Sequence, residues 1–404
     1  MLKNTTFSTL IFLTSLCLLV QDGYTQVWVT KASFPGHERD DGITFTVGNR
    51  AYCGTGLSSW FAPLGDFYSF DFTSEQWSLE GPLPSGKERQ YATGFSDNLY
   101  GYVFGGINGN TYLNDLWRYE TGAQSWQQMS SLPDSGRSGA AGFFLNGQLF
   151  VVGGKTESHS AINEVWSYDI ASDTWTQKNN MSYSIWRGSA CATDSLGYLS
   201  FGVDENGKYK SELLVYYPDT DQWSLLSPYP EEGLTHSTFI NMGQFLLSFG
   251  GRDSNDLYAN NLYRYNIISD NWNKLSAMPA AHRKGGVAFS HQSTFYYTTG
   301  ITALASRLRQ TWACTNVFIG NKEYMPSKLN VFPNPASSEL TLDFPPDIKQ
   351  VTIEFYDDSG KLKKKKSVTT QVRNIDVQDL PEGVYHLIIK SSEYKQHEQI
   401  IKLP

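Results

Sequence analysis

Tryptophan recurs along this chain at an almost constant spacing. Six tryptophans are separated by steps of 49, 49, 49, 48 and 49 residues, at Trp28, Trp77, Trp126, Trp175, Trp223 and Trp272. A period near fifty residues accommodates four short strands with their turns, which is one blade of a β-propeller. The spacing therefore predicts a repeat architecture in which every copy of the unit forms one small antiparallel sheet.

Other residues keep the same phase as the tryptophans. A proline follows seven residues after five of the six, at Pro35, Pro84, Pro133, Pro230 and Pro279, and Ser182 takes its place once. Because proline cannot donate to a sheet ladder, it predicts the end of the outer strand. Aromatic residues alternate before each internal tryptophan, as in Tyr68 and Phe70. This period of two predicts the third strand of each blade.

Glycines end the apolar run that precedes each third strand. Pairs occur at Gly105-Gly106, Gly153-Gly154 and Gly250-Gly251, with reduced forms at Thr55-Gly56, Phe201-Gly202 and Thr299-Gly300. Together with an arginine before the inner strand, a tyrosine and the tryptophan, this pattern resembles the kelch family from residue 26 to about 315. The resemblance implies a six-bladed propeller whose glycines let the second strand end in a tight turn.

The two ends of the repeat region complement each other. The sixth repeat begins at Arg283 and reaches a third strand near Trp312, but no outer strand with a tryptophan follows. Trp28 precedes any inner strand. We therefore expect Gln26 to Pro35 to supply the missing outer strand, since closure removes exposed sheet edges. The predicted fold class is all-β: a six-bladed kelch-type propeller over residues 26–319, closed by its N-terminal strand, plus a small C-terminal β-sandwich.

Residues 1–25 have the character of a secretory signal peptide, with Lys3 before an apolar stretch and cleavage expected before Gln26. The apolar stretch, Leu10 to Val20, is too short to span a bilayer, so no transmembrane segment is expected in the mature protein. Three cysteines remain after the signal, at Cys53, Cys191 and Cys314. Their spacing suits no zinc site, and we expect them to act as small apolar residues.

The sequence changes character near residue 328, after an expected linker at 320–327. Short alternating strands follow Val331-Phe-Pro-Asn-Pro335, and Leu380-Pro-Glu-Gly-Val-Tyr385 comes near the end. Residues 328–404 resemble the type A sorting domain of the type IX (Por) secretion system. The resemblance implies export to the cell surface or medium through that machinery, with removal of the domain by a sortase. Lys363 to Lys366 are expected to form a solvated edge strand rather than a polybasic site.

The net charge of −8 comes from the middle of the chain, because residues 320–404 contain twelve charges of each sign. An acidic domain repels phosphate backbones, so nucleic acid is not an expected partner.

Arginine recurs eleven or twelve residues after the tryptophans, at Arg39, Arg89, Arg137, Arg187 and Arg283, with Thr235-His236 in the fifth repeat. If these residues converge on one mouth of the channel, they form a site for an anion. The alternative is internal pairing with the acids that precede the third strands, Asp66, Asp115, Glu164 and Glu212. Repeats five and six have Asn261 and Gln310 at that position, so Arg283 is the arginine expected to be available.

Aromatic residues in the loops between second and third strands surround the same mouth. These are Trp60, Tyr112, Tyr209 and Tyr258, joined by Trp186 beside Arg187. Such side chains beside hydrogen-bond donors stack on sugar rings or hold peptides, although each alone also fits a packed surface residue.

The sequence offers no catalytic residue, metal site or cofactor motif. The histidines are dispersed without ligand spacing, and neither a nucleophile elbow nor a phosphate loop occurs. The leading hypothesis is therefore a secreted or surface-displayed binding module for protein or carbohydrate. The alternative is a sialic-acid-type epimerase or mutarotase on a six-bladed kelch scaffold, with Glu38, Glu88, His236 and His282 beside the arginines. Galactose oxidase shares the scaffold, but its copper ligand set has no counterpart in this sequence.

Overall fold

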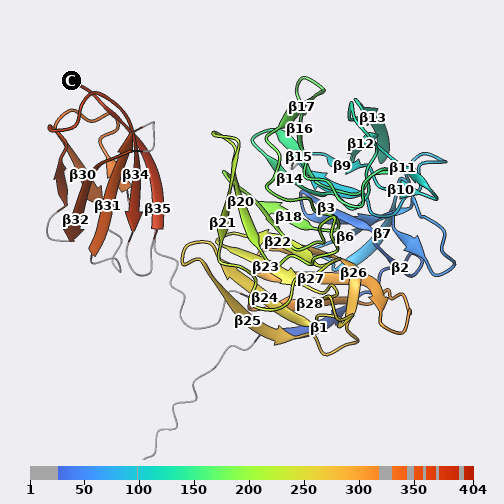
Figure 1. The fold of residues 1–404 in the computed structure, drawn as a ribbon. Coiled ribbons are helices and arrows are strands. Elements are labelled where there is room, and N and C mark those ends of the chain that lie inside the picture. The colour runs from blue at the N-terminus through green and yellow to red at the C-terminus, as the bar shows by residue number, and fades with distance from the viewer. Residues whose placement is uncertain are drawn as a thin grey trace, which may run out of the picture.

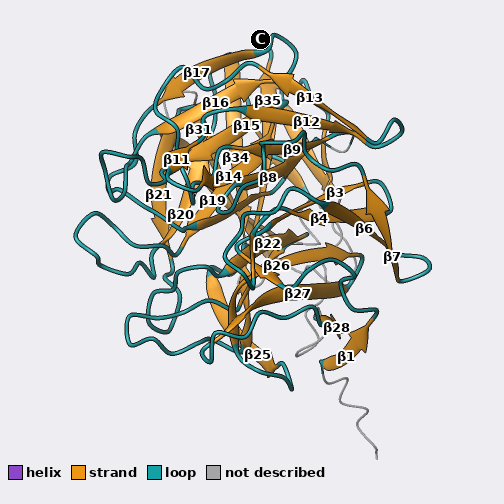
Figure 2. Ribbon diagram, turned by 90° about the vertical axis from the view of Figure 1, so that its right-hand side faces the viewer, coloured by secondary structure: helices purple, strands orange, loops and turns teal. Residues whose placement is uncertain are grey.

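The computed structural model describes residues 26–97, 99–317, 330–343, 350–357, 361–369, 373–390 and 395–404. Strands joined by loops make up these residues, and no helix occurs among them (Figure 2). The expected signal peptide at 1–25 and linker at 320–327 lie outside the described residues. The domain boundaries at 319 and 328 also fall there and stay predictions.

Within the described residues from Val27 to Thr315, the strands form six four-stranded antiparallel sheets, which we call blades one to six. Blade one contains β3 (Ile43–Val47), β4 (Arg50–Gly54), β6 (Phe67–Asp71) and β7 (Gln76–Glu80). Blade two contains β8 (Thr93–Ser96), β9 (Gly101–Phe104), β12 (Leu116–Glu120) and β13 (Ser125–Met129). Blade three contains β14 (Ala141–Leu145), β15 (Gln148–Val152), β16 (Val165–Asp169) and β17 (Thr174–Lys178). Blade four contains β18 (Ser189–Ala192), β19 (Gly197–Ser200), β20 (Leu213–Tyr217) and β21 (Gln222–Leu226). Blade five contains β22 (Thr238–Met242), β23 (Phe245–Phe249), β24 (Asn261–Asn266) and β25 (Asn271–Ala277). Blade six contains β26 (Arg283–His291), β27 (Thr294–Thr302), β28 (Thr311–Thr315) and β1 (Val27–Lys31). Short hairpin strands lie in the loops: β2 (Arg39–Asp40) with β5 (Leu57–Ser58), and β10 (Ile107–Asn108) with β11 (Thr111–Tyr112).

The first strands of the blades face one another around an axis (Figure 1). They contact in the order β3, β8, β14, β18, β22 and β26, and β26 again contacts β3. The fourth strand of blade six is β1, which pairs with β28 so that Trp28 lies opposite Cys314. The expected N-terminal strand therefore lies in the sheet that contains Trp312.

Five of the six tryptophans of the ladder tie their blade to the one before it; the indole N–H of Trp223 has no hydrogen-bond partner among the described residues. The indole N–H groups of Trp77, Trp126, Trp175 and Trp272 each donate to a backbone carbonyl 45 residues earlier, at the end of the preceding outer strand. Trp28 donates to Ser276 of blade five in the same way. Its ring also packs on Phe249 at 5.3 Å and Phe295 at 6.1 Å between centroids. The constant spacing thus reflects a contact made between blades as well as within them.

The paired glycines serve the role that the kelch resemblance implies. The second glycine of each pair has a positive φ, for example 97° at Gly106. A Cβ there would lie 2.8 Å from the carbonyl oxygen of Gln90. A side chain is therefore excluded where the loop after the second strand passes the neighbouring backbone.

The C-terminal module has two sheets that share one core. One sheet contains β29 (Asn330–Phe332), β30 (Glu339–Asp343) and β33 (Asn374–Asp376), and the other contains β32 (Leu362–Thr369), β31 (Gln350–Asp357), β34 (Gly383–Lys390) and β35 (Lys395–Lys402). Leu340, Phe355 and Leu387, from both sheets, are fully buried together, which makes the module a β-sandwich. The lysine run lies on β32, an edge strand, as expected.

Cys53, Cys191 and Cys314 are free thiols. Cys53 and Cys314 are buried, as expected of small apolar residues, and Cys191 is partly buried.

Candidate functional site

Three of the five arginines are buried and paired with the acids of their own blades. Arg39, Arg89 and Arg137 are at most 2% exposed. Their guanidinium groups contact Asp66 and Asp115 at 2.7 Å and Glu164 at 2.9 Å. For these residues the internal-pairing alternative is correct, so they do not present a ring of free donors to the channel.

Arg283 is also unavailable, which corrects the expectation that it is the free arginine. Its side chain is fully buried. It donates to Gln310 Oε1 at 3.0 Å and to the backbone carbonyls of Ala281 and Thr299 at 3.1 and 3.4 Å. The neutral amide of Gln310 thus takes the place of the missing acid, and burial lowers the pKa of this arginine.

Arg187 does not occupy the position of the other arginines. The second glycine of the preceding blade donates its N–H to the carbonyl of Arg89 in blade two and of Arg137 in blade three. In blade four the same hydrogen bond, from Gly154, goes to Ile185. Ile185 is therefore the equivalent residue, and Arg187 lies two residues later. The sequence spacing after tryptophan varies by one or two residues, which hid this offset.

Two residues after each of these positions the chain adopts a left-handed backbone. The six residues concerned have φ between 55° and 64°, and they form what we call the axial ring: Asp41, Tyr91, Gly139, Arg187, His236 and Gly285. Backbone hydrogen bonds link them around the axis, from Asp41 to Gly285, Tyr91 to Asp41, Gly139 to Tyr91, Arg187 to Gly139 and Gly285 to His236, at 2.7–3.2 Å. Since the left-handed conformation is strained for most non-glycine residues, the ring holds four side chains in a fixed orientation.

The axial ring lines a cavity of about 130 Å³. Arg187 is half-buried, and its guanidinium carbon lies 3.8 Å from the ring centroid of Trp186 and 4.4 Å from that of Tyr91. Its Nε is buried without a hydrogen-bond partner among the described residues, and the same is true of His236 Nε2. His236 Nε2 lies 3.9 Å from Asp41 Oδ1. The cavity therefore offers unused hydrogen-bonding atoms on Arg187 and His236, beside the carboxyl group of Asp41.

Burial dominates the electrostatics of the cavity. It raises the pKa of Asp41 from 3.8 to about 7, with a further increase from the Asp40 carboxylate. It lowers the pKa of His236 well below 6.5, assisted by the charges of Arg187 and Lys284. The neighbouring Asp40 forms an ion pair with Arg307 at 2.5 Å. At neutral pH His236 is consequently uncharged, and burial favours the protonated form of Asp41.

The family model described as the Attractin/LZTR1 beta-propeller matches residues 51–306, which is more than half of the chain. The chain belongs to the Attractin/LZTR1 β-propeller family. A second model, the secretion system C-terminal sorting domain, matches residues 330–403. The predicted Por-type sorting domain is thereby confirmed. It indicates that this Attractin/LZTR1-type propeller is exported through the type IX secretion machinery to the cell surface or the extracellular space.

The solved structure titled "Structure of YjhT" is similar to the propeller, with a TM-score of 0.60 and 19% sequence identity. The match covers 70% of this chain and 95% of that one, and at this identity it shows the fold alone. No curated protein matches the sequence. In the part of the chain that the structure describes, no helix is long and apolar enough for a bilayer span.

One of the five expected aromatic residues contacts the axial ring of the Attractin/LZTR1-type propeller directly: Trp186 stacks on Arg187. Tyr209 accepts a hydrogen bond from Arg252 at 3.1 Å, and Tyr258 lines a different cavity. The other two lie elsewhere. Trp60 is 56% exposed and contacts His37 edge-on at 4.6 Å. Tyr112 lies on the short strand β11.

The sequence did not identify Asp41, Tyr91, Arg252 or Lys284 as members of the site. Asp41 and Tyr91 lie two residues after Arg39 and Arg89, so a fixed offset from the arginines would have found them. The axial-ring position has a different residue type in most blades, and therefore no repeat in residue type marks it.

Proposed function

We propose that this protein is an exported binding module whose axial cavity receives an acidic group of a carbohydrate or protein ligand. The observation that carries the proposal is Arg187. Its guanidinium is held between Tyr91 and Trp186 at the cavity, and its Nε has no partner among the described residues. Arginine forks suit carboxylates, and a partly buried charge strengthens such a contact.

The surroundings of Arg187 support the same proposal. Lys284 and Arg252 both act on His236 electrostatically, so further positive charge lies near the cavity. Asp40 is already matched by Arg307. A cavity of about 130 Å³ has room for one functional group and not for a whole ligand. The rest of a ligand would then lie on Trp186, Tyr209 and Tyr258.

The purified protein applied to a glycan array containing neutral and acidic sugars tests the proposal. Arg187→Gly is the informative variant, because glycine already occupies the axial ring in blades three and six, at Gly139 and Gly285. We expect acidic glycans to bind the unmodified protein. We expect this binding to be lost in the Arg187→Gly variant. Arg118→Ala is the control, since Arg118 stacks on Tyr100 in blade two and does not line the cavity. Binding that survives Arg187→Gly contradicts the proposal.

A sugar epimerase or mutarotase is the second candidate function, and Asp41 is the observation that favours it. A carboxyl group with a pKa of about 7, beside Tyr91 and His236, is suited to donate and accept protons near neutral pH. Proton NMR of N-acetylneuraminic acid would follow anomeric exchange. Acceleration by the protein that disappears with Asp41→Asn would support the isomerase. An unchanged exchange rate together with retained binding would leave the binding module as the function.

A further inference from the structure

A large cavity lies away from the axis, between blades three and four. Its volume is about 600 Å³, within the range typical of small-molecule sites. We call it the blade 3–4 cleft. It is lined by residues from the loops before blades three and four and from the loops after β15 and β19, among them Asp134, Arg137, Glu164, Tyr183 and Glu205. It shares no lining residue with the axial cavity.

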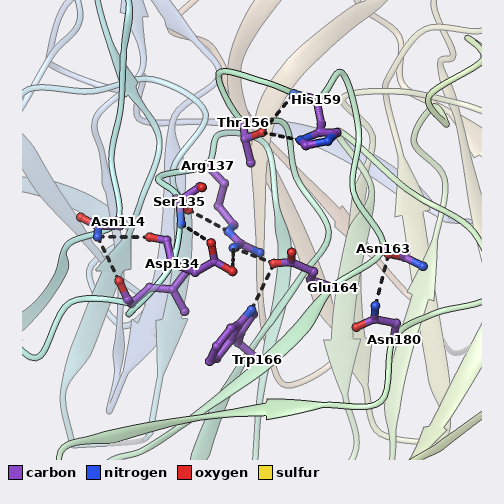
Figure 3. A network of polar contacts seen from close by, with 11 residues as sticks. Asn114, Asp134, Ser135, Arg137, Thr156, His159, Asn163, Glu164, Trp166 and Asn180 are labelled. Atoms are coloured by element: carbon purple, nitrogen blue, oxygen red, sulfur yellow. Dashed lines mark hydrogen bonds and ion pairs between the residues drawn. The ribbon is translucent and has the colours of Figure 1, made fainter.

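Arg137 is the anomalous member of the arginine set. In Arg39, Arg89 and Arg283 the Nη1 atom donates to a backbone carbonyl, at 2.9, 3.0 and 3.4 Å. Arg137 is 1% exposed, but its Nη1 is buried with no partner among the described residues. Figure 3 shows that the carboxylate of Glu164 lies between Nη2 of Arg137, at 2.9 Å, and Nε1 of Trp166, at 3.2 Å. Glu164 thus satisfies one arm of the fork and leaves the other with an unused donor.

A second unused polar atom lines the same cleft. The hydroxyl of Tyr183 is buried without a hydrogen-bond partner among the described residues. A buried polar atom that lacks a partner costs free energy, and a ligand that hydrogen-bonds to it recovers that cost. Two such atoms, from elements on opposite sides of the blade 3–4 boundary, make this cleft a built site rather than a surface depression.

The charges of the cleft select the chemistry of its ligand. The carboxyl groups of Asp134, Glu164 and Glu205 disfavour an anion, while the free arm of Arg137 calls for an acceptor. A sugar hydroxyl meets both demands, because it accepts from arginine and donates to a carboxylate. Serine and threonine hydroxyls complete the lining, at Ser135, Thr156, Ser158, Ser182 and Ser184.

We propose that the blade 3–4 cleft binds a neutral sugar residue, with Arg137 and Tyr183 hydrogen-bonded to its hydroxyls. This site is independent of the axial cavity, so it does not rest on the function proposed above. It gives the propeller a neutral-sugar subsite in addition to a site for an acidic group.

Saturation-transfer NMR on the full chain tests this site with methyl glycosides of D-glucose, D-galactose and D-mannose. Glucuronate is the charged counterpart of the glucoside. We expect at least one neutral glycoside to bind and glucuronate to bind more weakly in this cleft. Tyr183→Phe removes only an unpartnered hydroxyl, so it should fold normally and weaken binding about threefold to tenfold. Tyr217→Phe, at an exposed tyrosine on β20, is the matched control and should leave the affinity unchanged.

Three results would overturn the assignment. The first is that none of the three glycosides binds. The second is binding that Tyr183→Phe leaves unchanged, since the sugar would then lie elsewhere on the protein. The third is glucuronate binding that depends on Tyr183 and is tighter than that of the glucoside, because the cleft would then prefer an anion. None of these results bears on the axial cavity, whose proposal is tested through Arg187.

Discussion

The loss of the ion pair between Arg89 and Asp115 in blade two should destabilise the propeller strongly. Arg89 is fully buried and binds the carboxylate with both arms, at 2.7 and 3.0 Å. Asp115 also accepts from Trp117 Nε1 at 2.7 Å. Replacing Asp115 with alanine leaves the guanidinium buried without its counter-charge. Removal of one partner from such a pair costs about 3–5 kcal/mol.

The other blades supply two milder replacements for the same position. Blade six retains the arginine with a neutral acceptor, Arg283 with Gln310, which predicts that Asp115→Asn costs less than Asp115→Ala. Blade five has Leu234 in the arginine position and Asn261 in the acid position. The double variant Arg89→Leu with Asp115→Asn copies that pair, so it should be more stable than Asp115→Ala although it lacks the whole salt bridge.

Urea and thermal unfolding, followed by tryptophan fluorescence, measure these differences. Asp115→Ala should lower the melting temperature by on the order of 10 °C, and the double variant should regain part of that loss. An Asp115→Ala protein within about 1 kcal/mol of the unmodified one would refute the reasoning, because that is the range of an exposed pair. A double variant less stable than Asp115→Ala would refute it as well.

The same structure makes four further predictions. In Asp41 the pKa is raised from 3.8 to about 7 on folding, so the folded state binds the proton more tightly and loses stability as the pH rises from about 4 to about 7; Asp41→Asn should abolish this loss in unfolding curves measured across that range. In His236 the lowered pKa acts in the opposite sense, so its contribution to stability rises with pH up to about 6.5, and His236→Asn should flatten that rise. Trp28→Ala should destabilise the propeller by about 3–5 kcal/mol in urea unfolding, because it removes a ring packed on Phe249 and Phe295. Asn334 in the Pro-Asn-Pro segment bonds the backbone of Gln399 and Ile401, so Asn334→Ala should speed amide exchange in β35 while the propeller is unaffected; unchanged exchange in β35 would contradict this role.

The repeat phase could be predicted from the sequence because the residues that set it are chemically constrained. The tryptophan at five of the six outer strands reaches the preceding blade with its indole N–H, and the second glycine of each pair must have a positive φ. Few residue types satisfy either demand, so the pattern persists in the sequence. The same applies to Arg39, Arg89 and Arg137, whose acid partners were identified at the correct positions.

The site could be predicted only in part because its position is defined by backbone geometry. The axial ring needs a left-handed residue linked to its neighbours by main-chain hydrogen bonds, and this demand is met by aspartate, tyrosine, glycine, arginine and histidine alike. The sequence identified Arg187 as a candidate but grouped it with the other arginines. Those arginines are buried, and they occupy a position two residues before the axial ring in their own blades. In the blade 3–4 cleft Glu164 pairs with only one arm of Arg137, and only the three-dimensional structure shows the unused donor on the other arm.

The pairing of β1 with β28 completes blade six, which joins blades five and one through the axial ring. Hydrogen exchange measured by mass spectrometry tests this pairing without altering the protein. Terminal segments usually exchange rapidly unless they are tied down. We predict that Val27–Lys31 and Thr311–Thr315 are protected together, to the level of the outer strands of the other blades. Rapid, unprotected exchange at Val27–Lys31 while the other blades stay protected would contradict a ring closed by its own N-terminal strand.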